Sequence, residues 1–219
     1  MKKEQYKYRL FGRFKGRKKN NNPAFNLLNN FNIDIKKDIN QVNYNILDIG
    51  SGSGENAIYL SNLYSKAQII TCELFEDGNL NLCNQIILKK IRNISLFKGN
   101  VLEFLDILNQ KFIFDEIWIL FPDPWPKVRH HKRRLINDNF LKFIYFFIKK
   151  NGSLIIASDS QSYNRSIVNM IYKLKHLFFW ENQNFEDWNY DLLDLPKTKF
   201  YKKALKSNRN SMIFRLNKI

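Results

Sequence analysis

The sequence contains few cysteines, few histidines and no long apolar run. Its two cysteines, Cys72 and Cys83, give no disulfide framework and no paired-cysteine metal site. His130 and His131 are adjacent, and neighbours on a regular helix cannot both face one metal ion. We therefore expect no metal site. The longest apolar run, Phe143–Ile148, is far too short to span a membrane.

Acidic residues are also scarce. The chain has 20 Asp and Glu against 36 Lys and Arg, a net charge of +16. More than half of the cations lie in three blocks, residues 1–19, Lys127–Arg134 and Lys197–Arg209, and the last two blocks contain no acid. Such blocks favour a polyanionic partner. A compositional bias towards Asn, Ile and Lys explains part of the lysine excess, but not the clustering of arginine.

The length and composition bound the domain organisation. A chain of 219 residues with 44% hydrophobic residues can bury one sizeable core. We expect a basic N-terminal arm and cap helix over residues 1–42 and a single domain over residues 43–219. The amino terminus lacks the apolar core of a signal peptide, so we expect a cytoplasmic protein without a membrane partner. We also expect a monomer or a weak homodimer.

From residue 45 onward, short apolar runs alternate with segments of helical periodicity. Strands are predicted over 46–49, 68–73, 94–97, 113–121, 152–157, 178–185 and 211–216, and helices over 55–64, 76–91, 101–108, 139–149 and 163–174. This alternation predicts an α/β, Rossmann-like fold with a mostly parallel seven-stranded sheet and helices on both faces. Ligands of such sheets bind beyond the carboxyl ends of the strands.

The segment Asn45–Glu55 is typical of a strand, a glycine loop and the start of a helix. Gly52–Ala57 fits the G-x-G-x-x-A dinucleotide pattern, so a nicotinamide enzyme and a purely structural turn remain alternatives. Asp48, placed before the first glycine, instead favours S-adenosylmethionine, because it can bind the ammonium group that dinucleotides lack. Glu73 ends the second strand and suits ribose hydroxyls in either case.

Asn100 follows the third predicted strand. Its side chain can reach the adenine of a bound nucleoside. It can equally cap the helix that begins at Val101, because Asn is a preferred N-cap residue. One residue can do both, and the sequence leaves the two roles open.

The segment Phe121–Arg134, with the sequence FPDPWPKVRHHKRR, is the most informative part of the chain. Its prolines can hold Asp123 and Trp125 in fixed positions at a strand end, because proline restricts its own φ and its neighbour. Lys127, Arg129 and the Lys132–Arg134 cluster are expected to hold phosphates. The alternative is a proline-rich turn followed by a solvated basic helix.

Together these motifs resemble those of the bacterial tRNA (guanine-N7)-methyltransferase family. The resemblance is carried by Leu47–Gly52, Phe121–Arg134, Ala157–Asp159, Thr198–Phe200 and the basic lead-in Gly12–Arg17, in the same order along the chain. It implies a class I methyltransferase fold, S-adenosylmethionine as the cofactor, tRNA as the partner, and methylation of N7 of the variable-loop guanosine at position 46.

The resemblance also implies roles for individual residues. Asp123 is implied as catalytic. The residues implied to contact the methyl donor are Asp48, Gly50, Gly52, Glu73, Asn100 and Asp123, and those implied to meet the RNA are Lys127, Arg129, Asp159, Thr198, Lys199, Phe200 and Tyr201. The chain departs from the family pattern where Asn100 replaces an Asp and where Tyr201 replaces a Glu.

Two other functions stay open. An amino-methyltransferase acting on adenine N6 or guanine N2 shares the fold, but it typically has two consecutive prolines after its Asp or Asn, whereas Asp123-Pro124 is followed here by Trp125. A non-catalytic RNA-binding module would not need Asp48 and Glu73.

Overall fold

Seven strands form a single sheet in the computed structural model, which describes Ile39 and residues 43–219. The strands are β1 (Asn45–Ile49), β2 (Gln68–Glu73), β3 (Ile94–Lys98), β4 (Phe114–Leu120), β5 (Ile148–Ser158), β6 (Phe178–Trp180) and β7 (Met212–Lys218). Their order is β3-β2-β1-β4-β5-β7-β6, and only β7 runs antiparallel to its neighbours. The predicted sheet is confirmed. The arm and cap helix predicted over residues 1–42 lie outside the described residues, apart from Ile39.

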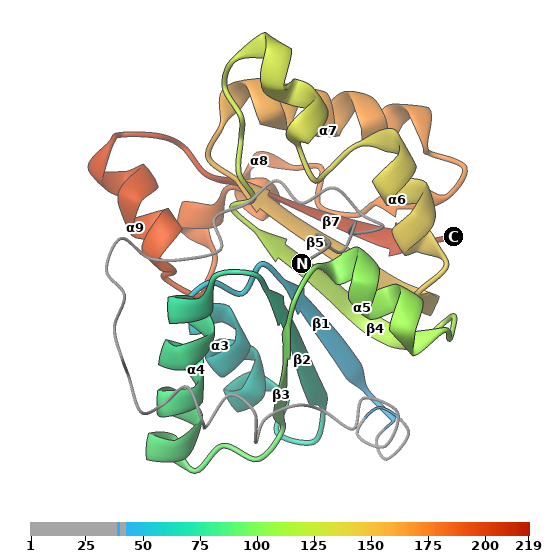
Figure 1. Ribbon diagram of the computed structural model, residues 1–219. Helices are drawn as coiled ribbons and strands as arrows, with labels where there is room; N and C mark the ends of the chain where they lie inside the picture. The colour runs from blue at the N-terminus through green and yellow to red at the C-terminus, as the bar shows by residue number, and fades with distance from the viewer. Residues whose placement is uncertain (1–38, 40–42) are drawn as a thin grey trace, which may run out of the picture.

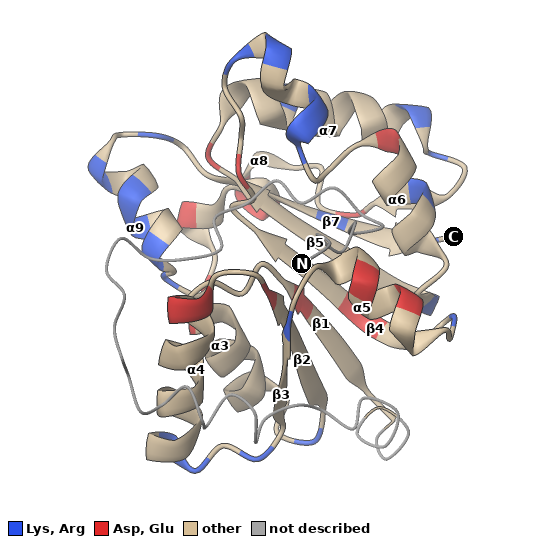
Figure 2. Ribbon diagram, viewed as in Figure 1, with Lys and Arg blue, Asp and Glu red and all other residues tan. Residues whose placement is uncertain are grey.

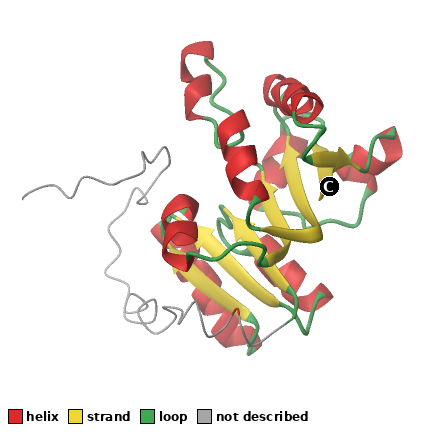
Figure 3. Ribbon diagram, turned by 90° about the vertical axis from the view of Figure 1, so that its right-hand side faces the viewer, coloured by secondary structure: helices red, strands yellow, loops and turns green. Residues whose placement is uncertain are grey.

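Helices cover both faces of the sheet (Figures 1 and 3). They are α3 (Glu55–Leu63), α4 (Glu76–Lys89), α5 (Val101–Leu108), α6 (Asp138–Tyr145), α7 (Gln161–Lys173), α8 (Phe185–Trp188) and α9 (Lys199–Lys206), with 3₁₀ turns η1 (Val128–Arg133) and η2 (Tyr190–Leu192). Helices α5, α6 and α7 share one core cluster, whereas α3 and α4 share another. None of the helices in this described part is long and apolar enough to cross a membrane.

The central strands are buried on both faces. Ile46 and Leu47 of β1 point to opposite faces because strand side chains alternate, and both are fully buried. Ile46 packs in the cluster with α3 and α4, and Leu47 packs in the cluster with α5 to α7. This two-sided burial explains why the strands appear as continuous apolar runs in the sequence.

The strand order reverses at β1, which pairs with β2 on one side and β4 on the other. Ligands of open parallel sheets bind near such a reversal, beyond the carboxyl ends. The five polar residues predicted for the site lie at or directly after the ends of β1 to β5. In chain order they are Asp48, Glu73, Asn100, Asp123 and Asp159. They therefore lie along one edge of the sheet.

The boundary between α6 and β5 differs from the sequence-based expectation. The sequence predicts a helix over residues 139–149, but α6 ends at Tyr145 and Ile148 already belongs to β5, paired with Phe114. The apolar run 143–148 fits a buried helix and a buried strand equally well, so periodicity alone could not place the boundary.

The strand predicted over residues 178–185 is also shorter than expected, because β6 ends at Trp180. Beyond Trp180, the side chain of Asn182 replaces the backbone of β6 as the hydrogen-bond partner of β7. Its Oδ1 accepts a hydrogen bond from the Arg215 amide at 2.7 Å, and its Nδ2 donates to the Ile213 carbonyl at 3.0 Å. A side chain thus satisfies backbone groups of β7, and the main chain is free to turn into α8.

Candidate functional site

The glycine loop between β1 and α3 is built from three glycines in the left-handed conformation. Gly50, Gly52 and Gly54 have φ values of 72°, 58° and 87°, which residues with a Cβ rarely adopt. A Cβ on Gly54 would overlap the Leu82 side chain, and one on Gly78 in α4 would overlap the carbonyl oxygen of Gly52. The loop therefore packs directly on α4 and presents mainly backbone groups to a ligand.

Asp48 lies at the end of β1 with its side chain only 1% exposed. Its Oδ1 accepts a hydrogen bond from Asn56 Nδ2 at 2.9 Å, whereas its Oδ2 has no partner within the described residues. Burial raises the pKa of Asp48 to about 7 despite the Asn56 hydrogen bond, and the charges of Glu73 and Glu55 add to the rise. Because an unpaired buried acceptor is costly, a cationic ligand group placed here would stabilise the anion.

Glu73 lies at the end of β2, and Asn100 lies just after the end of β3. The two carboxylate oxygens of Glu73 accept hydrogen bonds from the amides of Gly52 and Phe75, at 2.8 and 2.7 Å. Glu73 thereby fixes the glycine loop, and lone pairs remain for ribose hydroxyls. Asn100 Oδ1 accepts from the Leu102 amide at 2.9 Å, which confirms the capping role. A contact between Asn100 and adenine stays a prediction.

The loop after β4 holds Asp123 between two residues with a left-handed backbone. Phe121 and Trp125 have φ values of 52° and 42°, which are rare for bulky side chains and persist only where surrounding contacts impose them. The Phe121 ring packs against Tyr190, with centroids 5.3 Å apart. The Arg133 guanidinium lies 4.9 Å from the centre of the Trp125 ring. These contacts hold the backbone on both sides of Asp123.

Arg134 anchors the same loop. Its side chain is 4% exposed, and its Nε donates to the Pro124 carbonyl at 2.8 Å. Its two Nη atoms donate to the hydroxyls of Ser162 and Ser166 at 2.9 and 3.0 Å, and the guanidinium lies 4.7 Å from the centre of the Tyr163 ring. The expectation that Arg134 holds a phosphate is therefore wrong. The residue is buried and ties the loop to α7.

A cavity of about 1100 Å³ lies between this loop, α7 and the C-terminal helices, and both Asp123 and Asp159 line it. The Asp123 side chain reaches solvent, but partial burial of its carboxylate raises its pKa above the usual range. Asp159 Oδ2 accepts a hydrogen bond from Arg209 Nε at 2.8 Å, and Arg209 also lines the cavity. Two carboxylates from neighbouring strand ends therefore share one space, and one of them is paired with a cation.

The four residues of the predicted motif Thr198–Tyr201 have different environments at the start of α9. Thr198 is buried, and its Oγ1 accepts from the Tyr201 amide at 3.1 Å as the helix cap. Lys199 is exposed, and Phe200 is 47% exposed and lines the cavity. Tyr201 is buried and packs against the Phe121 ring at 6.2 Å. The structure thus brings Phe200 to the cavity and turns Tyr201 away from it.

Positive charge gathers near the cavity. Figure 2 shows Lys and Arg on α9 and on the turn that contains η1. Lys127 and Arg129 are exposed at that turn, as an RNA contact would require. Across the ranges that the structure describes, no group of three or more His, Cys, Asp or Glu is arranged to hold a metal ion.

Sequence reasoning missed three residues that the structure brings to the site. Gly78 lies in the first turn of α4. Glycine is unfavourable inside a helix, so its presence in the predicted helix could have indicated a close contact at this position. Arg209 stands out in the sequence only as part of a basic block. Nothing in the sequence pairs it with Asp159, which lies 50 positions away. Trp188 of α8 lines the cavity. The sequence predicts a strand over residues 178–185, just before it, and gives no sign of a helix there.

Comparison with known proteins identifies the family. Residues 43–214 match the family described as putative methyltransferase. A tRNA (guanine-N(7)-)-methyltransferase of Wolbachia pipientis wMel is 31% identical over 185 residues, which cover 84% of this chain and 80% of that protein. One of Buchnera aphidicola subsp. Schizaphis graminum is 32% identical over 177 residues, covering 79% and 72%.

Solved structures agree on the fold. An antibiotic-related methyltransferase superposes with a TM-score of 0.58 at 19% identity, covering 84% of this chain and 92% of that chain. A putative methyltransferase from Streptococcus mutans in complex with SAH gives 0.55 at 14% identity, covering 90% and 99%. These likenesses confirm the Rossmann-like methyltransferase fold. By its family match and by its identity to relatives over most of their length, the chain belongs to the tRNA (guanine-N7)-methyltransferase family.

Proposed function

We propose that this protein transfers a methyl group from S-adenosylmethionine to N7 of the guanosine at position 46 in the variable loop of tRNA. The names of the relatives support tRNA and the N7 atom. The observation that carries the proposal is the placement of Asp123 and Asp159 in one cavity at the same edge of the sheet as the glycine loop.

The residues around the glycine loop fit the methyl donor. When bound, S-adenosylmethionine supplies an electrophilic methyl group on a sulfonium centre. The unpartnered Oδ2 of Asp48 suits the ammonium group of its amino-acid part. Glu73 suits the ribose hydroxyls, Asn100 the adenine, and the backbone at Gly50 and Gly52 allows the close approach of the nucleoside.

The acceptor needs alignment more than proton transfer. Guanine N7 carries a free lone pair, so no general base is required, and the base becomes positively charged as the new bond forms. Alignment of two reactants can supply several kcal/mol. Asp123 and Asp159 can accept hydrogen bonds from guanine N1 and N2, which fixes the ring. Their negative charges also stabilise the developing cation.

The exposed basic residues fit the rest of the tRNA. Lys127, Arg129 and Lys199 are exposed beside the cavity and suit phosphates, which position an RNA without reading its sequence. Phe200 offers an exposed ring for a base. Selection of one guanosine would then come from the folded shape of the tRNA and from an accessible loop.

The test is the substitution Asp123→Asn, with Asp138→Asn as the matched control. The change keeps the shape of the side chain but removes its charge, and loss of one electrostatic partner in a preorganised site costs about a hundredfold in rate or more. Asp138 is a surface acid of α6, 3.8 Å from Lys173 and outside the cavity lining, so its substitution should leave turnover unchanged.

Turnover is measured with unmodified bulk tRNA and a labelled donor, and the product is mapped by nuclease digestion. Near-normal methylation by a folded Asp123→Asn protein would contradict the role of this carboxylate. Recovery of N2-methylguanine or N6-methyladenine would show that the acceptor atom is assigned wrongly, and N7-methylguanine elsewhere in the tRNA would overturn position 46.

A further inference from the structure

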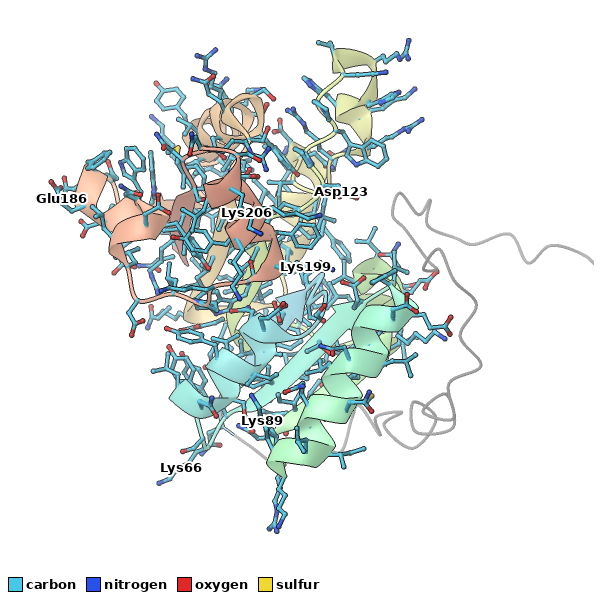
Figure 4. All side chains as sticks on the ribbon, turned by 90° about the vertical axis from the view of Figure 1, so that its left-hand side faces the viewer. Lys66, Lys89, Asp123, Glu186, Lys199 and Lys206 are labelled. Carbon is cyan, nitrogen blue, oxygen red and sulfur yellow. The ribbon has the colours of Figure 1, made fainter. Side chains whose placement is uncertain are left out.

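The cavity that holds Asp123 and Asp159 is larger than one base requires. Its volume of about 1100 Å³ exceeds the roughly 300–1000 Å³ of pockets that enclose drug-sized ligands, and a nucleobase is smaller than such a ligand. The lining continues from the loop after β4 to α8 and α9. Figure 4 labels Asp123, Lys199 of α9 and Glu186 of α8. In this view, Lys199 lies between Asp123 and Glu186. The far part of the cavity is thus formed by elements other than those that carry the carboxylates.

Trp188, on this far side, differs from the tryptophans that stabilise the core. Trp118 is buried, Trp180 packs against the core, and each donates its indole N–H to a side chain, at 2.7 and 2.9 Å. Trp188 belongs to neither core cluster. Its ring contacts the edge of Phe185, with centroids 5.0 Å apart, and its indole N–H has no hydrogen-bond partner in the described part of the chain. Packing alone therefore does not account for a half-buried tryptophan at a cavity wall.

Other residues of the same lining have the chemistry of a nucleotide site. Phe200 presents a 47% exposed ring, and Lys203 holds its ammonium group 5.4 Å from the centre of that ring. Both residues line the cavity, as does Arg165 of α7. Unpaired RNA bases are bound by stacking on aromatic rings, and their phosphates by Lys and Arg.

We propose that the part of the cavity lined by Trp188 binds the nucleotide next to the target guanosine, with its base stacked on Trp188 and its phosphates held by cations of the same lining such as Lys203 and Arg165. The proposal rests on the proposed function, because entry of the target guanosine brings its neighbour into the cavity. Stacking tolerates any base, so this site requires a base at the neighbouring position without selecting its identity.

The experiment compares the wild type with Trp188→Ala and Trp188→Phe in steady-state methylation of unmodified tRNA. Trp188→Ala should raise the KM for tRNA about tenfold, the order that stacking of one base supplies. The kcat, the KM for the donor and the salt dependence of the KM should stay within about twofold, because stacking is not ionic. Trp188→Phe keeps a ring and should show a smaller rise. Tyr172→Ala, a change at a 72% exposed aromatic of α7 outside the lining, is the matched control and should change nothing.

Synthetic tRNAs with an abasic residue on the 5′ or the 3′ side of the target guanosine test the partner of Trp188 directly. One of these RNAs should raise the KM of the wild type about tenfold and should not weaken Trp188→Ala further. Trp188→Phe repeats the comparison in case Trp188→Ala folds poorly, and its KM should rise less on that abasic RNA than the KM of the wild type does.

An unchanged KM for folded Trp188→Ala, or equal losses of affinity by wild type and variant on both abasic RNAs, would overturn the second site. Absence of guanosine methylation by the wild type would instead contradict the proposed function. The two failures are therefore distinguishable.

Discussion

Arg134→Ala is expected to lower stability and turnover without changing the salt dependence of tRNA binding. The guanidinium makes three hydrogen bonds of 2.8, 2.9 and 3.0 Å and a longer one of 3.5 Å to the Ser162 carbonyl, and it lies over the Tyr163 ring. A hydrogen bond from a charged group contributes about 1.5–3 kcal/mol and a cation–π contact about 0.5–2 kcal/mol, and such contributions do not add fully at one site. We expect the free energy of unfolding to fall by about 3 kcal/mol, which lowers the Tm of a chain of this size by roughly 6–12 °C.

Turnover should fall because the backbone next to Asp123 is no longer anchored. A misplacement of about 1 Å can cost on the order of a hundredfold in rate. Donor binding at the glycine loop should not change, since the side-chain hydrogen bonds of Arg134 among the described residues go to Pro124 and α7. Arg134→Lys should recover only part of the stability, because one ammonium group cannot reach all of these acceptors in the fork geometry.

Arg129→Ala is the matched control for this prediction, because it removes an exposed arginine from the same turn. It should leave Tm unchanged and reduce the slope of log affinity against log salt by about 0.7–0.9, the effect of one phosphate that is no longer neutralised. The assays are thermal unfolding and tRNA binding at several salt concentrations. If Arg134→Ala keeps its Tm and flattens the salt slope, the guanidinium binds RNA and its role as an anchor is refuted.

Three further predictions concern the donor site and the basic surface. Gly78→Ala should weaken donor binding at least tenfold and spare tRNA affinity, because its Cβ would push against the carbonyl of Gly52; calorimetry with the donor measures this. The raised pKa keeps Asp48 largely protonated below about pH 7, whereas binding of the donor's ammonium group requires the Asp48 anion. Donor affinity should therefore increase as the pH rises towards 7, and binding should release a proton. Asp48→Asn should abolish this pH dependence. Combined Lys199→Gln and Lys206→Gln should reduce the slope of log tRNA affinity against log salt by less than one unit for each phosphate contact that is lost. An unchanged slope would show that α9 does not contact the RNA.

The order of the elements could be predicted because each central strand is a buried apolar run that ends close to a glycine, a proline or a polar residue. Asp48, Glu73 and Asp123 lie at or just after the ends of such runs, so their common edge follows from the parallel topology. Helix α9 was not predicted from the sequence. The reason is its short length and its lysines, since Tyr201 and Ala204, its buried residues, do lie on one helix face and Thr198 caps its start.

The contacts between distant segments could not be predicted from the sequence. Arg134 stands in a run of basic residues that looks uniform, and only the packing of α7 against the loop shows that this guanidinium is buried while that of Arg129 is exposed. The pairing of Arg209 with Asp159 likewise depends on how the C-terminal segment returns to β5. Local propensity carries no information about such contacts, because the partners are set by tertiary packing.

The packing of Tyr201 is consistent with the departure from the family pattern that the sequence resemblance implies at this position. Tyr201 lies against Phe121 and Tyr190, with centroids 6.2 and 4.8 Å away, so a carboxylate at this position would be buried among aromatic rings at considerable cost. The tyrosine instead supports Phe121, whose left-handed backbone begins the loop that carries Asp123. Within the described residues, Asp123 and Asp159 are the only acids in the cavity lining. If guanine binds as proposed, it therefore has two carboxylates to contact in this cavity, and Tyr201 supports the loop instead of supplying a third.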